Sequence, residues 1–121
     1  MNTPAKLPGR DAEELACRYL VERGLQVTAR NYRCPRGEID LIMRDGDSVV
    51  FVEVRYRRSS RFGSGAETVD SRKQSRLIAT AMHYLQANRN VAKHPARFDV
   101  VAVSPGDVRQ SVQWIRDAFQ A

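Results

Sequence analysis

Four charged side chains recur at every second position in two apolar segments that lie close together in the chain. Glu38 and Asp40 belong to the first segment, and Glu53 and Arg55 belong to the second. Carboxylates among packed apolar side chains are costly unless a divalent cation or an arginine offsets their charge. Two interpretations are open here: the carboxylates bind a metal ion, or Arg55 neutralises Glu38 or Glu53 in a purely structural network.

A β-hairpin over residues 37–55 would bring these side chains together. Asp45-Gly46 separates two β-rich runs and suits a tight turn, because glycine tolerates a positive φ. A two-residue turn there would pair Glu38 with Glu53. A four-residue turn over residues 45–48 would instead pair Asp40 with Glu53 and Glu38 with Arg55. Both registers place all four charges on one face of the sheet.

The apolar residues of this hairpin predict a sheet that is buried on both sides. Because strand side chains alternate, the face opposite the charges should be core, formed by Ile39, Leu41, Met43, Val50, Val52 and Val54. The charged face is itself half apolar, since Ile42, Val49 and Phe51 share it. Strands of this kind are typically covered by other elements on both faces.

The remaining elements follow from periodicity and from turn residues. Residues 11–23 predict a helix that ends at Gly24, and residues 25–32 predict a strand followed by a loop over 33–37. A second helix is expected from Ser71, with Ser71 and Gln74 as a capping box, to about Asn88. Residues 97–103 and 111–115 predict two further strands. Asp99 fits either a third acidic site residue or a structural partner of an arginine.

The acidic hairpin resembles a known nuclease signature. Asp40, twelve intervening residues and then Glu53-Val54-Arg55 are similar to the Asp…(Asp/Glu)-x-Lys pattern of restriction-endonuclease-like nucleases. A wider set of residues resembles the YraN family of small bacterial proteins, usually described as similar to archaeal Holliday junction resolvases. This set covers nearly the whole chain: Gly9, Glu13, Ala16, Tyr19-Leu20, Asn31-Tyr32-Arg33, residues 37–42, residues 51–54, Lys73 and residues 97–101.

The resemblance implies roles for individual residues. Asp40 and Glu53 would bind Mg²⁺ or Mn²⁺ with help from Glu38, and Glu13 falls where the family has its glutamate. Carboxylates that hold such a metal let it polarise a phosphate and lower the pKa of a bound water. In related resolvases an acidic residue on the first helix joins the active site.

At Arg55 the sequence departs from the family, which most often carries lysine there. Arginine stays protonated and cannot act as a base, although it can hold a phosphate. Lys73 falls where a lysine recurs in the family. It would contact phosphate or partly substitute for the lysine that position 55 lacks.

Basic residues beside the hairpin predict contacts with the nucleic-acid backbone. Arg33 and Arg36 flank Cys34-Pro35 just before the acidic strand, where they could meet an incoming phosphate or simply line a solvated turn. Residues 57–70 form a basic segment rich in Gly and Ser, which we expect to be mobile and to order on phosphates. Its candidate DNA-binding residues are Arg57, Arg58 and Arg61.

Length and charge agree with these expectations. A chain of 121 residues predicts one domain over 1–121, with residues 1–9 flexible. A net charge of +6 and a pI near 9.9 indicate a polyanionic partner. No apolar run approaches a membrane span, and the N-terminus lacks the apolar core of a secretion signal, so we expect a cytoplasmic protein without a membrane partner. Cys17 and Cys34 are expected to be free thiols.

The resemblance therefore implies an α/β protein with a restriction-endonuclease-like αβββαβ core, a mixed sheet flanked by helices. The expected function is metal-dependent cleavage of DNA, branched or structured, by a homodimer. One alternative is a nucleic-acid-binding protein of the same fold whose catalysis is weak or absent because Arg55 replaces lysine. Another alternative is an adaptor whose acidic face binds a protein partner.

Overall fold

The computed structural model describes residues 9–56, 69–104 and 111–121. Residues 1–8 of the expected flexible N-terminus and most of the expected mobile basic loop, including Arg57, Arg58 and Arg61, lie outside these ranges, whereas Gly9 begins a helix. Neither of the two long helices in the described ranges has the length and apolar character that a membrane span requires. Both cysteines are free, as the sequence predicts.

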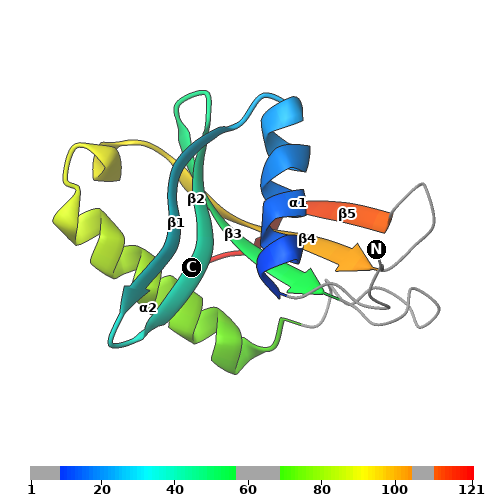
Figure 1. Ribbon diagram of the computed structural model, residues 1–121. Helices are drawn as coiled ribbons and strands as arrows, with labels where there is room; N and C mark the ends of the chain where they lie inside the picture. Colours follow the sequence, from blue (N-terminus) through cyan, green and yellow to red (C-terminus); the bar gives the residue numbers. More distant parts are fainter. Residues whose placement is uncertain (1–8, 57–68, 105–110) are drawn as a thin grey trace.

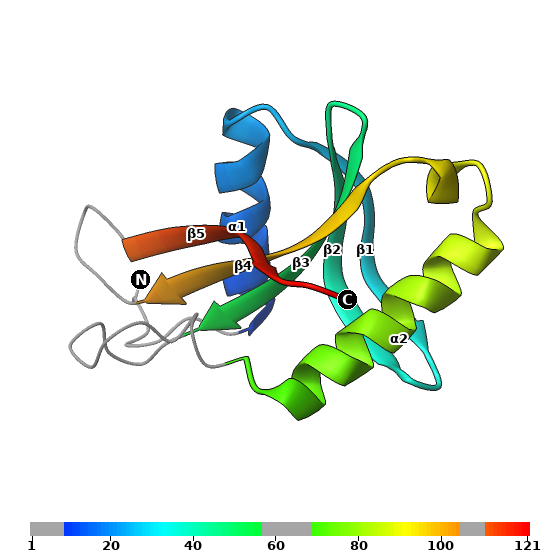
Figure 2. The same ribbon diagram turned by 180° about the vertical axis from the view of Figure 1, so that it is seen from behind.

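A mixed five-stranded sheet lies between two helices, which cover its opposite faces (Figures 1 and 2). The strand order is β1-β2-β3-β4-β5, with β3 and β4 parallel and every other pair antiparallel. This arrangement confirms the predicted α/β class and the restriction-endonuclease-like core. The elements are α1 (Gly9–Glu22), β1 (Gln26–Cys34), β2 (Gly37–Asp45), β3 (Ser48–Tyr56), α2 (Ser71–Ala87), the short 3₁₀ helix η2 (Val91–Lys93), β4 (Ala96–Ser104) and β5 (Ser111–Phe119).

Each helix closes a separate apolar core on its side of the sheet, as the two-sided apolar pattern of the hairpin predicts. Parallel neighbours such as β3 and β4 need a long crossover, and α2 lies in that connection. The α2 core includes Ile39, Ile42, Val49, Phe51, Leu77, Tyr84, Phe98 and Val100. The α1 core includes Ala16, Leu20, Leu41, Met43, Val50, Val52, Val101 and Val103.

The hairpin register decides which charges face one another. Asp45 pairs with Ser48 and Leu41 pairs with Val52, and Asp40 and Glu53 are the next residues beyond this paired stretch. This is the second of the two predicted registers. The turn itself lies at Gly46-Asp47, one residue later than Asp45-Gly46, because Gly46 takes the first turn position with a φ of 63°.

The predicted division of β2 into a charged face and an apolar face is wrong at Asp40. Ile39 packs with Ile42 in the α2 core, whereas Leu41 packs in the α1 core, so the alternation of faces fails between residues 39 and 41. The Asp40 carboxylate accepts a hydrogen bond from the Val54 backbone N–H at 2.8 Å. At this point the backbone N–H of Val54 on β3 is therefore bonded by a side chain of β2, and Asp40 lies where the hairpin is irregular.

Three predicted boundaries also need correction. β1 runs to Cys34, which leaves only Pro35 and Arg36 between it and β2, and β5 runs on to Phe119. The N-cap of α2 is Asp70 rather than Ser71, because the Asp70 Oδ1 accepts from the Lys73 backbone N–H at 2.8 Å. Asp and Ser are both favoured N-cap residues. The sequence pattern alone therefore does not distinguish Asp70 from Ser71 as the N-cap.

Candidate active site in the cavity between β2, β3 and α2

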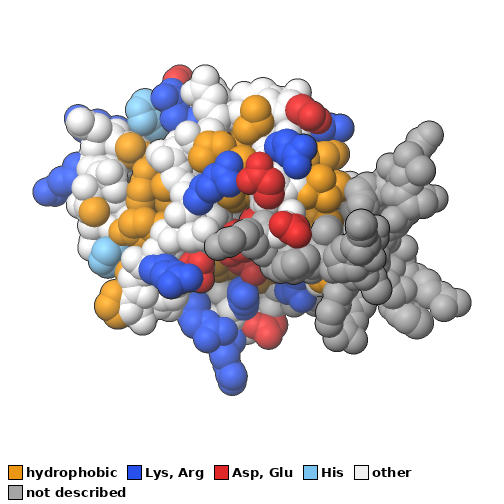
Figure 3. All heavy atoms as spheres, in the orientation of Figure 1, with side chains coloured by type: hydrophobic (Ala, Val, Ile, Leu, Met, Phe, Trp, Pro, Cys, Tyr) orange, Lys and Arg blue, Asp and Glu red, His pale blue; other side chains and the backbone are white. Residues whose placement is uncertain are grey.

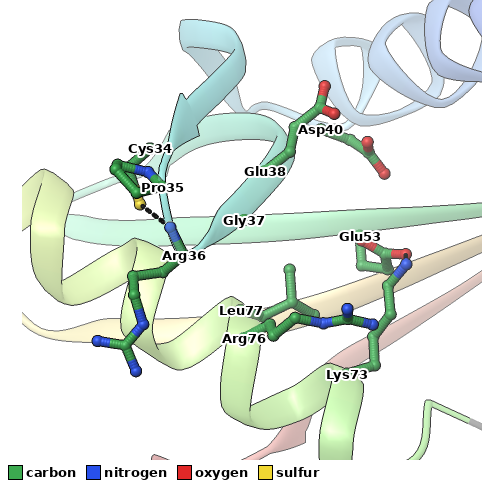
Figure 4. Close-up of a pocket in the computed structure, with 10 residues that line it drawn as sticks. All are labelled: Cys34, Pro35, Arg36, Gly37, Glu38, Asp40, Glu53, Lys73, Arg76 and Leu77. Atoms are coloured by element: carbon green, nitrogen blue, oxygen red, sulfur yellow. Dashed lines mark hydrogen bonds and ion pairs between the residues drawn. The ribbon is translucent and has the colours of Figure 1, made fainter.

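A cavity of about 540 Å³ opens between the hairpin and α2, and five of the predicted site residues line it: Arg36, Glu38, Asp40, Glu53 and Lys73. Figure 4 shows Glu38 and Asp40 entering from β2 on one side, while Lys73 and Arg76 enter from α2 on the other side. On the surface, acidic side chains lie among Lys and Arg side chains across the middle of this face (Figure 3). The cavity is lined by Cys34, Pro35, Arg36, Gly37, Glu38, Asp40, Glu53, Lys73, Arg76 and Leu77.

Asp40 is half-buried, and its carboxyl group is unusually hard to ionise. Burial raises its pKa, the negative charge of Glu53 raises it further, and Glu13 adds a smaller effect in the same direction. Hydrogen bonding from the Val54 N–H opposes this effect, and the pKa settles at about 8. Asp40 and Glu53 are therefore close enough to repel each other strongly, and a cation between them would be stabilised.

Glu53 is the most deeply buried carboxylate of the cavity, with 8% of the residue exposed. Its Oε2 lies 3.0 Å from the Nζ of Lys73, in the first turn of α2 (Figure 4). A lysine near a helix N-terminus interacts unfavourably with the helix dipole. The ion pair with Glu53 offsets this interaction and explains why a lysine occupies position 73. Lys73 occupies the place where a cation would be expected.

Glu38, which lines the cavity, is linked to Glu13, which does not, by a residue that was not among the predicted site residues. The Asn31 side-chain Nδ2 donates to Glu13 Oε1 and to Glu38 Oε2, each at 3.1 Å. Asn31 has a φ of 49°, which Asn tolerates better than most residues. Its position in the Asn31-Tyr32-Arg33 motif was the sequence feature that could have identified Asn31 as a site residue. Arg33 lies 3.6 Å from Glu38 and is largely exposed.

The cationic side of the cavity differs from the predicted one. Arg36 lines it from the β1–β2 turn, as expected for a residue near an incoming phosphate. Arg76 also lines it, although the sequence argument missed this residue. Its spacing of three from Lys73 places both on one face of α2, which was the available signal. Arg55 lies two residues beyond Glu53 on β3 and is not one of the described residues that line the cavity.

The donor chemistry suits Mg²⁺ or Mn²⁺, whereas the arrangement of side chains does not yet form a complete ligand set. Asp40, Glu53 and Glu38 offer the carboxylate oxygens that these hard cations prefer. Within the described ranges, however, no group of three or more His, Cys, Asp or Glu side chains is placed to hold a metal ion. Two carboxylates from neighbouring strands and a lysine that neutralises one of them form the centre of the site.

Asp99 is not part of this cavity, and its surroundings show a structural role. It is 1% exposed and is bound by Arg97, whose Nε lies 3.0 Å from its Oδ1. The Trp114 Nε1 and the Asp117 backbone N–H each donate to it at 2.9 Å. Burial alone would lower the pKa of Arg97, but hydrogen bonds with Asp99 and Asp45 outweigh it and raise that pKa. Of the two predicted alternatives, the structural partner of an arginine is confirmed.

Gly37 fixes how closely the β1–β2 turn approaches α2. Its φ is 156°, and a Cβ there would lie 3.0 Å from Thr80 Oγ1 and 3.6 Å from the Arg76 Cβ. We expect Gly37→Ala to lower the free energy of unfolding by about 1–3 kcal/mol, because the backbone is strained for L-residues and the contact is tight. Urea denaturation measures this change.

Gly46→Ala is the matched control for that substitution. Gly46 also has a positive φ, of 63°, but nothing lies within 4 Å of the Cβ that it would gain. Its substitution should cost about 1 kcal/mol, from the backbone conformation alone. Equal losses for the two variants would contradict the close docking of the turn on α2.

Comparison with known proteins gives one family. The sequence profile of an uncharacterised protein family, UPF0102, matches residues 12–103. A UPF0102 protein of Nitrosococcus oceani is 52% identical over 112 residues, covering 93% of this chain and 90% of the relative. Relatives from Stutzerimonas stutzeri and Pseudomonas aeruginosa are 51% and 50% identical, each over 93% of this chain and over 94% and 92% of their own lengths.

Proposed function

The chain belongs to the uncharacterised protein family UPF0102, the YraN family of the sequence resemblance, and from that premise we propose that it is a metal-dependent DNA endonuclease. Its substrate would be branched or structured DNA, and its cofactor would be Mg²⁺ or Mn²⁺. The observation that carries the proposal is the pair of carboxylates, Asp40 and Glu53, in one cavity. Burial, and after it the negative charge of Glu53, raise the pKa of Asp40 to about 8.

A purely structural role explains this pair poorly. Folding has placed two carboxylates from neighbouring strands together at a cost, and only Glu53 has a basic partner among the described ion pairs of the cavity centre. By contrast, the structural carboxylate Asp99 is satisfied by an arginine, an indole and a backbone N–H. Perturbed acidic groups in a cleft are typical of functional sites.

In the proposed mechanism, Asp40 and Glu53 hold the metal ion, and Glu38 and Glu13 assist. The bound metal would supply a polarised phosphate and a water of lowered pKa. Asn31 orients Glu13 and Glu38 through its two hydrogen bonds. Lys73, whose partner Glu53 would then bind the metal ion, would face the scissile phosphate together with Arg55. Arg33 and Arg36 would contact the DNA backbone.

A second candidate function is nucleic-acid binding without cleavage. The specific observation in its favour is the Lys73–Glu53 ion pair of 3.0 Å, which already neutralises one of the two metal-binding carboxylates. Arg55 in place of lysine points the same way, because an arginine cannot accept a proton. DNA binding by a homodimer is compatible with both candidates.

Nicking of a branched DNA substrate tests the two candidates against each other. A nuclease requires Mg²⁺ or Mn²⁺ and loses activity in Asp40→Ala and in Glu53→Ala. A binding protein shows salt-sensitive affinity in wild type and in both variants, with no cleavage in any of them. Asp47→Asn is the matched control, because it removes an exposed carboxylate at the hairpin turn and should change neither property.

Substitutions at positions 73 and 55 test how much Lys73 and Arg55 each contribute to cleavage. We expect Lys73→Gln to reduce cleavage by about 10²-fold, because a cation beside the scissile phosphate is lost. Arg55→Lys should raise cleavage if the family lysine is the better catalyst at that position. Single-turnover rates with saturating Mg²⁺ separate these effects from binding. An unchanged rate in Lys73→Gln would exclude it from the chemistry.

A further inference from the structure

Two arginines that line the cavity, Arg36 and Arg76, have no carboxylate partner among the described residues. Six arginines form ion pairs with Asp or Glu: Arg18, Arg23, Arg30, Arg33, Arg97 and Arg116. Arg36 and Arg76 form none with a described residue, although Glu38, Asp40 and Glu53 line the same cavity. Two guanidinium groups are thus held in a cavity with their charge available to a ligand.

The backbone beneath these two arginines is firmly placed. Arg36 precedes Gly37, which packs against Thr80 so closely that a Cβ would come within 3.0 Å of the Thr80 Oγ1. Thr80 is fully buried, and its hydroxyl donates to the Arg76 backbone carbonyl at 2.8 Å. One tight contact therefore joins the turn that carries Arg36 to the helical turn that carries Arg76. Because the backbone at both positions is fixed, binding of an anion has only the two side chains to order.

The side chains point in different directions, which sets what they can hold. Figure 4 shows Arg76 extending beside Lys73 toward the Glu53 side of the cavity, whereas Arg36 extends the other way, beyond the turn. Because the two guanidinium groups point apart, we take each to contact a phosphate of its own, as two phosphates of one strand would supply.

We propose that Arg76 and Arg36 bind two successive backbone phosphates of a single nucleic-acid strand, leading away from the phosphate beside Glu53 and Lys73. The ligand is a polyphosphate backbone, because guanidinium groups bind phosphate oxygens through paired N–H donors and remain charged at any pH. This inference rests on the proposed function for the direction of the strand. It assigns a role to Arg76, and it predicts that an extended strand, rather than an isolated anion, fills the cavity.

Binding of a fluorescent eight-residue thymidylate strand in EDTA tests this proposal without any cleavage. We expect Arg36→Gln and Arg76→Gln each to weaken binding by about three- to tenfold at low salt. Each should also reduce the slope of log affinity against log salt by about 0.7. Because the two residues would hold different phosphates, the losses should multiply in the double variant. Arg89→Gln, just beyond the C-terminal end of α2, is the matched control and should bind as wild type.

The outcomes separate this proposal from the nuclease proposal. Losses no larger than that of Arg89→Gln, or failure of wild type to bind the strand, would overturn the phosphate contacts whatever the nicking assay shows. Inorganic phosphate that competes as well as the strand would show a single anion site and would also overturn them. Binding that depends on both arginines, in a protein that does not cleave with Mg²⁺, would support them and reject the nuclease.

Discussion

Asp40→Asn should abolish Mg²⁺-dependent cleavage, with a loss of at least about 10³-fold, and should at the same time make the protein more stable at pH 8. The first effect follows from the loss of a charged metal ligand. The second follows because the raised pKa of Asp40 reflects the cost of ionising a partly buried carboxyl group that also lies beside Glu53. An amide has no charge to repel Glu53, and its oxygen can still accept from the Val54 N–H.

The gain in stability should depend on pH in a definite direction. Asp40 ionises near pH 4 in the unfolded chain and near pH 8 in the folded protein, so the folded state holds the proton more tightly between these values. The stability contributed by protonated Asp40 is fully present below about pH 4 and is lost as the pH rises through about 8. Asp40→Asn should therefore match wild type near pH 4 and exceed it by about 1–3 kcal/mol at pH 8.

Thermal and urea unfolding at both pH values, together with calorimetric titration of Mg²⁺, measure these effects. Wild type should gain stability from Mg²⁺ at pH 8, and Asp40→Asn should not. Asp47→Asn controls for the removal of one negative charge elsewhere on the hairpin. A variant that is less stable than wild type at pH 8 would contradict the account of Asp40.

Asp99→Ala should produce the largest loss of stability, about 3–5 kcal/mol, because it leaves a buried arginine without its main partner. The Asp99 side chain is fully buried, while that of Arg97 is 18% exposed. The Trp114 indole N–H and the Asp117 N–H would lose their acceptor as well. Since these donors lie on β5, the edge of the sheet should loosen first.

The structural assignment of Asp99 predicts which properties do not change. At a temperature where Asp99→Ala remains folded, its affinity for Mg²⁺ should equal that of wild type, because Asp99 does not line the cavity. Asp45→Ala removes a second, half-exposed acceptor of Arg97 and should cost only about 1 kcal/mol. Selective loss of Mg²⁺ affinity in Asp99→Ala, with stability retained, would return it to the list of site residues.

Features with a strong local signal were predictable from the sequence. Helical and strand periodicities give the order of the elements and the two-sided burial of the hairpin, and both agree with the structure. Gly24 ends α1 as predicted, with a φ of 102°. The observed pairing follows one of the two predicted registers, and Asp40 and Glu53 come directly after its last pair, Leu41 and Val52.

Features that depend on packing between distant segments were not predictable. The alternation of β2 fails at Asp40, where the side chain bonds a strand that lies 14 residues away along the chain. Arg76 lines the cavity because of where α2 packs across the sheet. The β1–β2 turn packs on α2 through Gly37. Asn31 bridges two glutamates from different elements, which no short window of sequence can reveal.

The hydrogen bond from Val54 to Asp40 also affects how the site assembles. The hairpin is held by regular backbone pairing from its turn as far as Leu41 and Val52, and beyond that the Asp40 side chain provides the next link. Fraying of this open end would separate the two acids without disturbing the packed layers beneath. The amide proton of Val54 thus reports on the site itself, and slower deuterium exchange there would signal an occupied pocket before any turnover begins.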